Sequence, residues 1–348
     1  MRGSPAACRR SQRKREGIEA RIPILDSVPS MSAIPPAFVV VTPVFEDVQA
    51  ATRLFRELAT TFGHRVHVVA VDDGSVRQPM DAQVMKTAGL IGTVIRLRRN
   101  IGHQRAIAVG LSYVAEHMRT APRIVVMDSD GEDLPGSIPD LLEQLTADDV
   151  DLVVAQRRTR VETLRFKTFY AIYKRLFKLL TGRNISFGNF MALKPAAVKR
   201  LTAMHELWTH VASCVLASRL RVATCALDRG PRYAGKSKMN FVGLALHGFR
   251  GVMVFAEDVL VRVGIASALI GSLAIVGGLA SIVLKVSGFA TPGWFSVALG
   301  VLLIVFLQTG TLALMSLMLT GVSKAGAPAP ADYAHAIDFM EHSNGQSA

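Results

Sequence analysis

Two acidic clusters follow short apolar runs in this sequence of 348 residues. The triplet Asp128-Ser129-Asp130, with Glu132 and Asp133 close behind, comes directly after Arg123–Met127 (RIVVM). Carboxylates packed this closely repel one another unless a cation neutralises them. Hard oxygen ligands at the end of a strand suit Mg²⁺ or Mn²⁺ that also holds a diphosphate. This cluster therefore predicts a site for a divalent ion and a diphosphate.

The second cluster, Asp72-Asp73-Gly74-Ser75, follows the apolar run Val66–Val71 (VHVVAV). Gly and Ser permit a tight turn that exposes two carboxylates to a ligand. Carboxylates accept hydrogen bonds from the imide of a base or from a ribose hydroxyl. A plain turn between a strand and a helix has the same composition, so the cluster by itself leaves both interpretations open.

The elements that must position these clusters alternate along the chain from Phe38 onward. Expected strands are Phe38–Thr42, Val66–Val71, Thr93–Leu97, Arg123–Met127 and Asp151–Ala155, and expected helices are Val48–Phe62 and a stretch from about 102 to 118. Unbroken apolar strands that alternate with helices predict an α/β domain with a mostly parallel sheet covered on both faces. Both acidic clusters then lie just past the carboxyl ends of strands, where open α/β sheets bind their ligands.

The motifs resemble those of glycosyltransferase family 2, which has a Rossmann-like GT-A fold, and most closely its polyprenyl-phosphate hexose synthases, the dolichol-phosphate mannose synthase-like enzymes. The resemblance covers about Val39 to Asn240. The matches, in chain order, are Pro43-Val44-Phe45-Glu46-Asp47 for P-x-Y-N-E, Val71–Ser75 for V-D-D-G-S, Arg99-Asn100-Ile101-Gly102 with Ala106 for R-N-x-G…A, Asp128–Pro135 for D-A-D-L-Q-D-P-P, Phe187-Gly188-Asn189-Phe190 for G-D-F, and Arg229…Arg232…Gly235-Lys236-Ser237-Lys238 for R-x-x-R-x-x-G-x-S-K.

This resemblance implies roles for individual residues. The nucleoside pocket would be lined by Pro43, Phe45, Asp47, Asp72 and Asp73. The diphosphate and the metal ion would be contacted by Asp128 and Asp130, with Glu132 as a candidate further ligand. Donor or acceptor phosphates would be contacted by Arg157, Arg158, Arg232, Lys236, Ser237 and Lys238. Asp133 is the candidate general base if the acceptor is a hydroxyl group.

Three positions depart from the family pattern. Phe45 lacks the tyrosine hydroxyl and Glu46 replaces Asn, which leaves the nucleotide base open between UDP- and GDP-linked donors. Asn189 replaces Asp in the G-D-F segment, so an anionic role at that position is lost.

The function that the resemblance implies is transfer of a sugar from a nucleotide to a polyprenyl phosphate, which gives a lipid-linked sugar for glycan assembly or modification. A phosphate monoester is largely dianionic at pH 7 and attacks without a general base. It needs cations around the two anionic substrates, which the segments 157–158 and 232–238 provide. Two alternatives are a family 2 transferase with a glycan or lipid hydroxyl acceptor and a non-catalytic membrane scaffold. The intact Asp128, Asp130 and 232–238 segment argue against a scaffold.

The C-terminal third predicts a membrane anchor. Val263–Leu284 and Ala290–Ser323 contain no charged residue, and each exceeds the roughly 20 residues that span a bilayer core. Arg250, Arg262 and Lys324 flank the near ends while only Lys285 lies near the far turn, which favours a cytoplasmic catalytic domain with both termini inside. Two amphipathic stretches, Leu164–Leu180 and Phe241–Phe255, are expected to rest on the membrane surface. For the two uncharged apolar segments, the alternative is a pair of buried helices in a soluble core. For the two amphipathic stretches, the alternative is ordinary helices that face the core of the domain.

The expected organisation follows from these segments. Residues 1–33 form a basic disordered leader, 34–240 the catalytic domain, 241–262 an amphipathic juxtamembrane helix, 263–321 two membrane helices and 322–348 a cytoplasmic tail. The net charge of +13 indicates a polyanionic partner. Membrane lipid and phosphorylated substrates explain both the positive charge and the apolar segments, whereas a nucleic acid explains only the charge. Three cysteines without C-x-x-C spacing predict free thiols in a reducing compartment. A homo-oligomer is left open.

Overall fold

The computed structural model describes residues 36–157, 164–233, 241–289, 293–325 and 333–344. Its strands are β1 (Phe38–Val44), β2 (Val66–Asp72), β3 (Ile91–Leu97), β4 (Ile124–Val126), β5 (Leu152–Arg157), β6 (Met191–Leu193), β7 (Val222–Leu227) and β8 (Ile337–Asn344). Its α-helices are α1 (Val48–Phe62), α2 (Ala82–Thr87), α3 (His103–His117), α4 (Ile138–Gln144), α5 (Leu164–Thr181), α6 (Pro195–Thr202), α7 (Val211–Ala217), α8 (Phe241–Met253), α9 (Ala256–Val286) and α10 (Trp294–Ala325). Four short 3₁₀ turns are η1 (Gly63–Arg65), η2 (Pro135–Ser137), η3 (His205–Trp208) and η4 (Ala334–Ala336).

All eight strands belong to one mixed sheet in the order β7-β5-β6-β4-β1-β2-β3-β8. The central strands β4, β1, β2 and β3 are parallel, while β6 and β8 run antiparallel to their neighbours. The mostly parallel sheet and its five expected strands are confirmed. The strands β6, β7 and β8 were not predicted. A strand as short as β6 (MAL), and one as exposed as β7, lack the long apolar run that marks a parallel-sheet interior.

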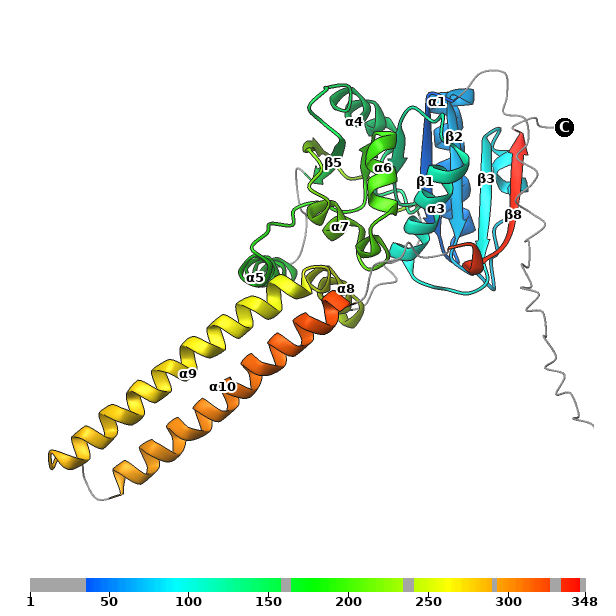
Figure 1. Cartoon of the computed structure of the whole chain (residues 1–348). Coiled ribbons are helices and arrows are strands. Elements are labelled where there is room, and N and C mark those ends of the chain that lie inside the picture. Colours follow the sequence, from blue (N-terminus) through cyan, green and yellow to red (C-terminus); the bar gives the residue numbers. More distant parts are fainter. Residues whose placement is uncertain (1–35, 158–163, 234–240, 290–292, 326–332, 345–348) are drawn as a thin grey trace, which may run out of the picture.

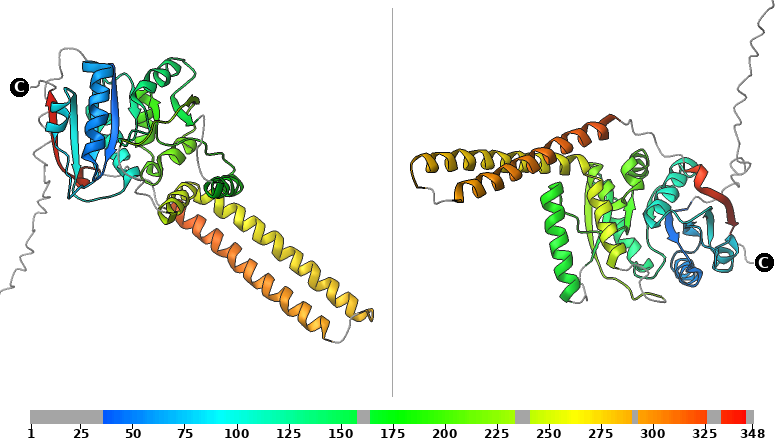
Figure 2. Two further views of the ribbon diagram at one scale, coloured as in Figure 1. Left: turned by 180° about the vertical axis from the view of Figure 1, so that it is seen from behind. Right: turned by 90° about the horizontal axis from the view of Figure 1, so that it is seen from below.

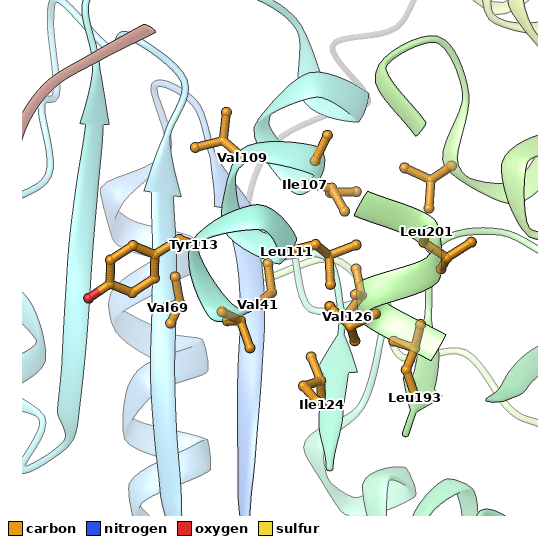
Figure 3. Packing of buried hydrophobic residues seen from close by; sticks show 14 of the residues in the cluster. Val41, Val69, Ile107, Val109, Leu111, Tyr113, Ile124, Val126, Leu193 and Leu201 are labelled. Carbon is orange, nitrogen blue, oxygen red and sulfur yellow. The ribbon is translucent and has the colours of Figure 1, made fainter. Parts of the chain in front are cut away.

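Two apolar layers cover the two faces of the sheet, as Figure 1 shows. On one face, α3 and α6 pack on the central strands. Figure 3 shows Ile107 and Leu111 of α3 between Val41 and Val126 of the sheet and Leu201 of α6. On the other face, α1, α2 and α4 bury residues such as Leu54, Phe55 and Leu141. This double covering explains why the central strands are apolar without alternation.

The helices α9 and α10 form a long antiparallel pair that projects away from the sheet domain (Figures 1 and 2). Both are long and apolar enough to cross a membrane by length and composition. Small residues of α9, such as Ser267 and Gly271, lie in the contact with α10, whereas large side chains of both helices face outward: Leu273 of α9 is 63% and Leu314 of α10 is 65% exposed. A helix pair in a soluble core would bury such side chains, so the arrangement favours the membrane hairpin.

At the base of the hairpin lie α5 and α8 (Figure 1). Each has a row of exposed apolar side chains at helical spacing, which are Ile172, Leu176 and Leu179 on α5 and Val242, Leu246, Phe249 and Met253 on α8. The amphipathic character predicted for both helices is present in the described side chains. The helix break at residues 254–255 falls inside the predicted juxtamembrane segment 241–262, because α9 begins at Ala256.

The C-terminal residues differ from the sequence-based expectation. Residues 322–348 were assigned to a tail, but Ile337–Asn344 forms β8 and pairs antiparallel with β3 from Ile91 to Leu97. Figure 1 shows β8 at the sheet edge opposite α4 and β5. The chain therefore returns to the sheet domain after α10. The predicted leader, residues 1–33, lies outside the described residues.

Candidate active site

The acidic turn after β4 folds back on itself. Asp133 accepts a hydrogen bond through Oδ2 from the backbone N–H of Asp128 (2.9 Å), and Asp130 accepts one through Oδ1 from the N–H of Glu132 (3.0 Å). Ser129 donates from its hydroxyl to the carbonyl of Pro43 at the end of β1 (2.9 Å). The turn thus lies at the carboxyl ends of the central parallel strands, as predicted.

A second segment, Arg229–Tyr233, lies along this turn. The N–H of Gly230 donates to the carbonyl of Glu132 (3.0 Å), and the N–H of Tyr233 donates to that of Asp130 (2.9 Å). A Cβ at Gly131, whose φ is +89°, would lie 2.6 Å from the ring of Tyr233, so only glycine permits this approach.

Two arginines bring positive charge into the acidic turn. Arg229 pairs with Glu132. Arg232 reaches Oδ2 of Asp130 (2.9 Å) and Oε1 of Glu132 (3.2 Å). The sequence analysis assigned Arg232 to phosphate contact but gave Arg229 no role. The structure brings both arginines to the carboxylates of the predicted metal site.

Oδ1 of Asp128 is the least satisfied polar atom of this turn. It is buried, lies 3.2 Å from Nε2 of His103, and has no hydrogen bond of acceptable geometry. His103 begins α3, which follows Gly102 (φ +96°). Nε2 of His103 also lies 3.0 Å from Nδ2 of Asn189. A buried carboxylate oxygen without a hydrogen-bond donor is costly unless a cation approaches it.

The electrostatics of the turn follow from burial and crowding. Burial, followed by the charge of Asp128, raises the pKa of Asp130 and holds that of Asp133 well above its ordinary range. Burial also opposes ionisation of Asp128, but His103 and the two arginines outweigh it and lower the pKa of Asp128. Asp128 is therefore the carboxylate that stays ionised, and Asp133 the one that most readily holds a proton.

The predicted metal-binding residues fit a divalent ion in part. Asp128 and Asp130 offer hard oxygen donors, and the buried Oδ1 of Asp128, which lies 3.2 Å from His103, is the donor that most needs a further cation. Glu132 is turned toward Arg229 and Arg232, and no three His, Cys, Asp or Glu side chains converge as a metal-binding set in the part of the chain that the structure describes. Two carboxylates with substrate phosphates are a common ligand set for Mg²⁺.

The turn after β2 uses its carboxylates to hold the backbone. Asp72 accepts from the N–H of Ser75 (3.0 Å) and from that of Met80 (2.9 Å). Asp73 accepts from the N–H groups of Ile101 (2.8 Å) and Gly102 (3.0 Å), while burial raises the pKa of Asp73 to about 6. Both side chains are buried. The two aspartates predicted to line the nucleoside pocket therefore shape its loops through hydrogen bonds of their own.

The remaining residues predicted for donor binding lie at the end of β1. Pro43 is buried and Phe45 is 41% exposed. Asp47 is the N-cap of α1, since its side chain accepts from the N–H of Ala50 (3.3 Å). An exposed aromatic ring beside an acidic turn suits stacking on a base.

Glu46, which departs from the family pattern, has a clear structural role. Its backbone lies in the left-handed region (φ +48°) and its N–H donates to Oγ of Ser75 (2.8 Å). Its carboxylate accepts from the N–H groups of Val76 (2.8 Å), Arg77 (3.1 Å) and Gln78 (3.0 Å), and these bonds lower the pKa of Glu46. Glu46 thus fixes residues 75–78, which follow the Asp72-Asp73 turn.

We expect Glu46→Gln to raise the donor KM about tenfold with a smaller change in kcat, because an amide offers one acceptor oxygen where the carboxylate offers two. Steady-state kinetics with varied donor measure this effect. Glu143→Gln, on the exposed face of α4, is the control and should match the wild type. An unchanged donor KM in Glu46→Gln would show that the loop keeps its shape without this carboxylate.

The residues predicted for acceptor binding are only partly placed. Arg157 ends β5 and is exposed, and its charge acts on Asp133. Arg232 lies in the acidic turn, as described above. Arg158, Lys236, Ser237 and Lys238 lie outside the described residues, so their predicted roles stay predictions.

A polar chain that the sequence analysis missed joins the acidic turn to α7. Asn189 contacts His103 and accepts from Nε2 of Gln104 (3.2 Å). Oε1 of Gln104 accepts from the N–H of Val211, at the start of α7 (2.7 Å). His103 and Gln104 directly follow the matched R-N-x-G segment, and this position in the sequence could have indicated that they belong to the site. The amide of Asn189 is thus used as a hydrogen-bonding bridge where the family pattern has a carboxylate.

Comparison with known proteins gives the family of this domain. Residues 39–207 match the family model of glycosyl transferase family 2. The dodecaprenyl-phosphate galacturonate synthase of Rhizobium johnstonii is 25% identical over 214 residues, which cover 57% of this chain and 60% of that protein. The uncharacterized glycosyltransferase YkoT of Bacillus subtilis is 22% identical over 237 residues, which cover 67% of this chain and 69% of that protein.

Solved structures give a weaker match. The glucosyl-3-phosphoglycerate synthase of Mycobacterium tuberculosis, in complex with Mn²⁺, UDP-glucose and phosphoglyceric acid, is 18% identical with a TM-score of 0.46, over 65% of this chain and 79% of that one. This chain spans about three fifths of the length of the galacturonate synthase. The matched segment contains both acidic turns. Residues 39–207, just under half of the chain, therefore match a glycosyl transferase family 2 domain.

Proposed function

We propose that this chain is a glycosyltransferase that moves a sugar from a nucleotide-sugar onto a polyprenyl phosphate at the membrane surface, with Mg²⁺ or Mn²⁺ at Asp128 and Asp130. One observation carries the proposal: the segment Arg229–Tyr233, which covers the acidic turn, precedes α8 by seven residues, and the apolar hairpin begins directly after α8. The cations of the site and the exposed apolar face of α8 are therefore neighbours in the chain.

The acceptor class is supported by the surroundings of the site. The exposed apolar rows of α5 and α8 lie at the base of the hairpin, where Lys174, Arg175 and Lys178 of α5 are also exposed. Basic amphipathic helices bind the interface of an anionic leaflet. The relative in Rhizobium johnstonii is named for a dodecaprenyl-phosphate product, which makes a polyprenyl phosphate the first acceptor to test.

The proposed reaction requires little proton transfer by the protein. A phosphate oxygen of the acceptor forms the new bond to the anomeric carbon as the bond from that carbon to the nucleoside diphosphate breaks. The metal ion, when bound, stabilises the charge on the departing diphosphate as a Lewis acid. Arg229 and Arg232 hold the two anionic substrates together. Asp133, whose pKa is raised, transfers no proton in this reaction unless the acceptor is a hydroxyl.

The strand β8 supports a hairpin whose two ends lie on one side of the membrane. Because β8 follows α10 and pairs with β3, the chain before α9 and the chain after α10 join the same folded domain. Both ends of the hairpin then lie on the side of the membrane that holds the catalytic domain. Arg250 and Arg262 near the start of the hairpin favour the cytoplasmic side.

The deciding experiment supplies purified enzyme with radiolabelled UDP- and GDP-sugars and either polyprenyl phosphate or the matched polyprenol. We expect label in the lipid fraction only with polyprenyl phosphate, with Mg²⁺ or Mn²⁺ present and not in excess EDTA. Equal labelling of the polyprenol would indicate the alternative, a transferase with a hydroxyl acceptor. Transfer that persists in EDTA would contradict the metal assignment.

A further inference from the structure

The C-terminal segment Tyr333–Asn344 contacts the loops that hold the two aspartates of the β2 turn. The first contact is at the end of β3, where Arg98 donates from its backbone N–H to the carbonyl of Ala336 (3.0 Å) and from Nε to that of Ile337 (2.9 Å). Tyr333, which is buried, donates to Oε2 of Glu116 on α3 (2.6 Å). The chain is therefore fixed at the start of β8 by three hydrogen bonds.

Arg98 leads directly into the loop that supports Asp73. Three and four residues later, the N–H groups of Ile101 and Gly102 donate to the two oxygens of Asp73. The backbone of Arg99 presses on the same turn, since a Cβ at Gly74 would lie 2.3 Å from its carbonyl carbon. A shift of Arg98 would therefore move the donors to Asp73.

The second contact is at the other loop. Glu341 accepts through Oε2 from the N–H of Ala82 at the start of α2 (2.8 Å). Two residues before Ala82, the N–H of Met80 donates to Asp72. Ser343 donates to the carbonyl of Leu90, just before β3 (2.9 Å). The strand β8 thus fixes the end of this loop that joins α2, while Glu46 fixes the end that follows the Asp72-Asp73 turn.

We propose that the C-terminal segment Tyr333–Asn344 is a positioning element of the nucleotide site, acting through Arg98 on Asp73 and through Glu341 on the loop of Asp72. The inference rests on the proposed function for the identity of the bound nucleotide. Its consequence is that the nucleotide site is complete only after the hairpin has been made and the chain has returned to the sheet.

The test uses the full-length enzyme in detergent with UDP and GDP as probes, by equilibrium binding and by donor and acceptor kinetics. Arg98→Met and Glu341→Met, each of which removes one hydrogen-bonding side-chain group, are expected to weaken nucleotide binding and raise the donor KM about tenfold, the loss typical of one hydrogen bond to a charged group. The acceptor KM and kcat should stay within about twofold. Arg98→Lys, which keeps a donor on a similar stem, should recover part of the affinity. Asp338→Asn, exposed on the same strand, is the matched control.

The outcomes separate the two proposals. If the wild type binds UDP or GDP and both variants bind it equally well, the positioning role is wrong while the proposed function stands. If donor KM, acceptor KM and kcat all worsen together with the melting temperature, the segment acts only on stability and the inference is again wrong. If Arg98→Met does not fold, Glu341→Met decides the question alone. A wild type that binds neither nucleotide would overturn the proposed donor class.

Discussion

Asp128→Asn is expected to lower sugar transfer by about a thousandfold or more, the effect of removing a preorganised charge from a transfer site. Asn keeps the shape of the side chain but removes the negative charge that is buried beside His103. The turn itself should persist, because the bond from the turn to Asp133 starts at the backbone N–H of residue 128. The measurement is initial-rate transfer of radiolabelled sugar, with thermal unfolding as a check on the fold.

The control for this prediction is Asp148→Asn, an exposed aspartate in the turn after α4, which should match the wild type. Asp130→Asn should resemble Asp128→Asn, because both carboxylates are proposed to hold the same ion. If transfer fell in Asp130→Asn but not in Asp128→Asn, the catalytic charge would have to be assigned to Asp130 and not to Asp128. Near-normal transfer in both variants would rule out the metal and diphosphate site at this turn.

Arg232→Gln is expected to lower kcat/KM for the lipid acceptor about a hundredfold while the donor KM changes less than threefold. The guanidinium is 30% exposed and lies between Asp130 and Glu132, in the segment that leads toward α8. Glu132 keeps Arg229 as a partner in this variant, so the turn retains one of its two cations. The loss should therefore fall on the anionic acceptor, which needs the second cation as it approaches.

Two further variants sharpen the result for Arg232. Arg221→Gln removes another ion-paired arginine, which binds Asp151 at 2.6 Å beside β7, and should leave both KM values unchanged. Arg232→Lys keeps the charge without the planar fork and should recover only part of the activity. Donor and acceptor kinetics that decline in equal proportion would show that Arg232 serves the site as a whole and has no selective role toward the acceptor.

The sequence by itself determined the central sheet and the acidic turns, because these depend on local patterns. Apolar runs such as Val39–Val41 and Val66–Val71 form parallel strands wherever both faces are covered, and the polar residues after them must lie at one edge. The two apolar helices follow from composition and length in the same way. The motif spacing was enough to place Asp128, Asp130 and Arg232 in one site before the fold was known.

Only the tertiary structure decided which partners these side chains have. Glu132, a candidate metal ligand, pairs in the folded chain with Arg229 and Arg232, which lie about 100 residues away. Asp72 and Asp73, which are predicted to line the nucleoside pocket, accept hydrogen bonds from backbone donors of two loops. The contact of Glu132 with Arg232 and that of Asp73 with Ile101 depend on loop closure over long sequence separations, which no local pattern records.

The strand β8 is the clearest case of a feature that the sequence did not reveal. Its residues (IDFMEHSN) lack a long apolar run, and its partner β3 lies more than 200 residues earlier in the chain. The pairing becomes favourable because β3 would otherwise be an open edge with unpaired backbone groups. Composition and motifs thus predicted the chemistry and the membrane anchor, whereas the contact between the C-terminal strand and the loops of Asp72 and Asp73 arises only when the sheet is assembled.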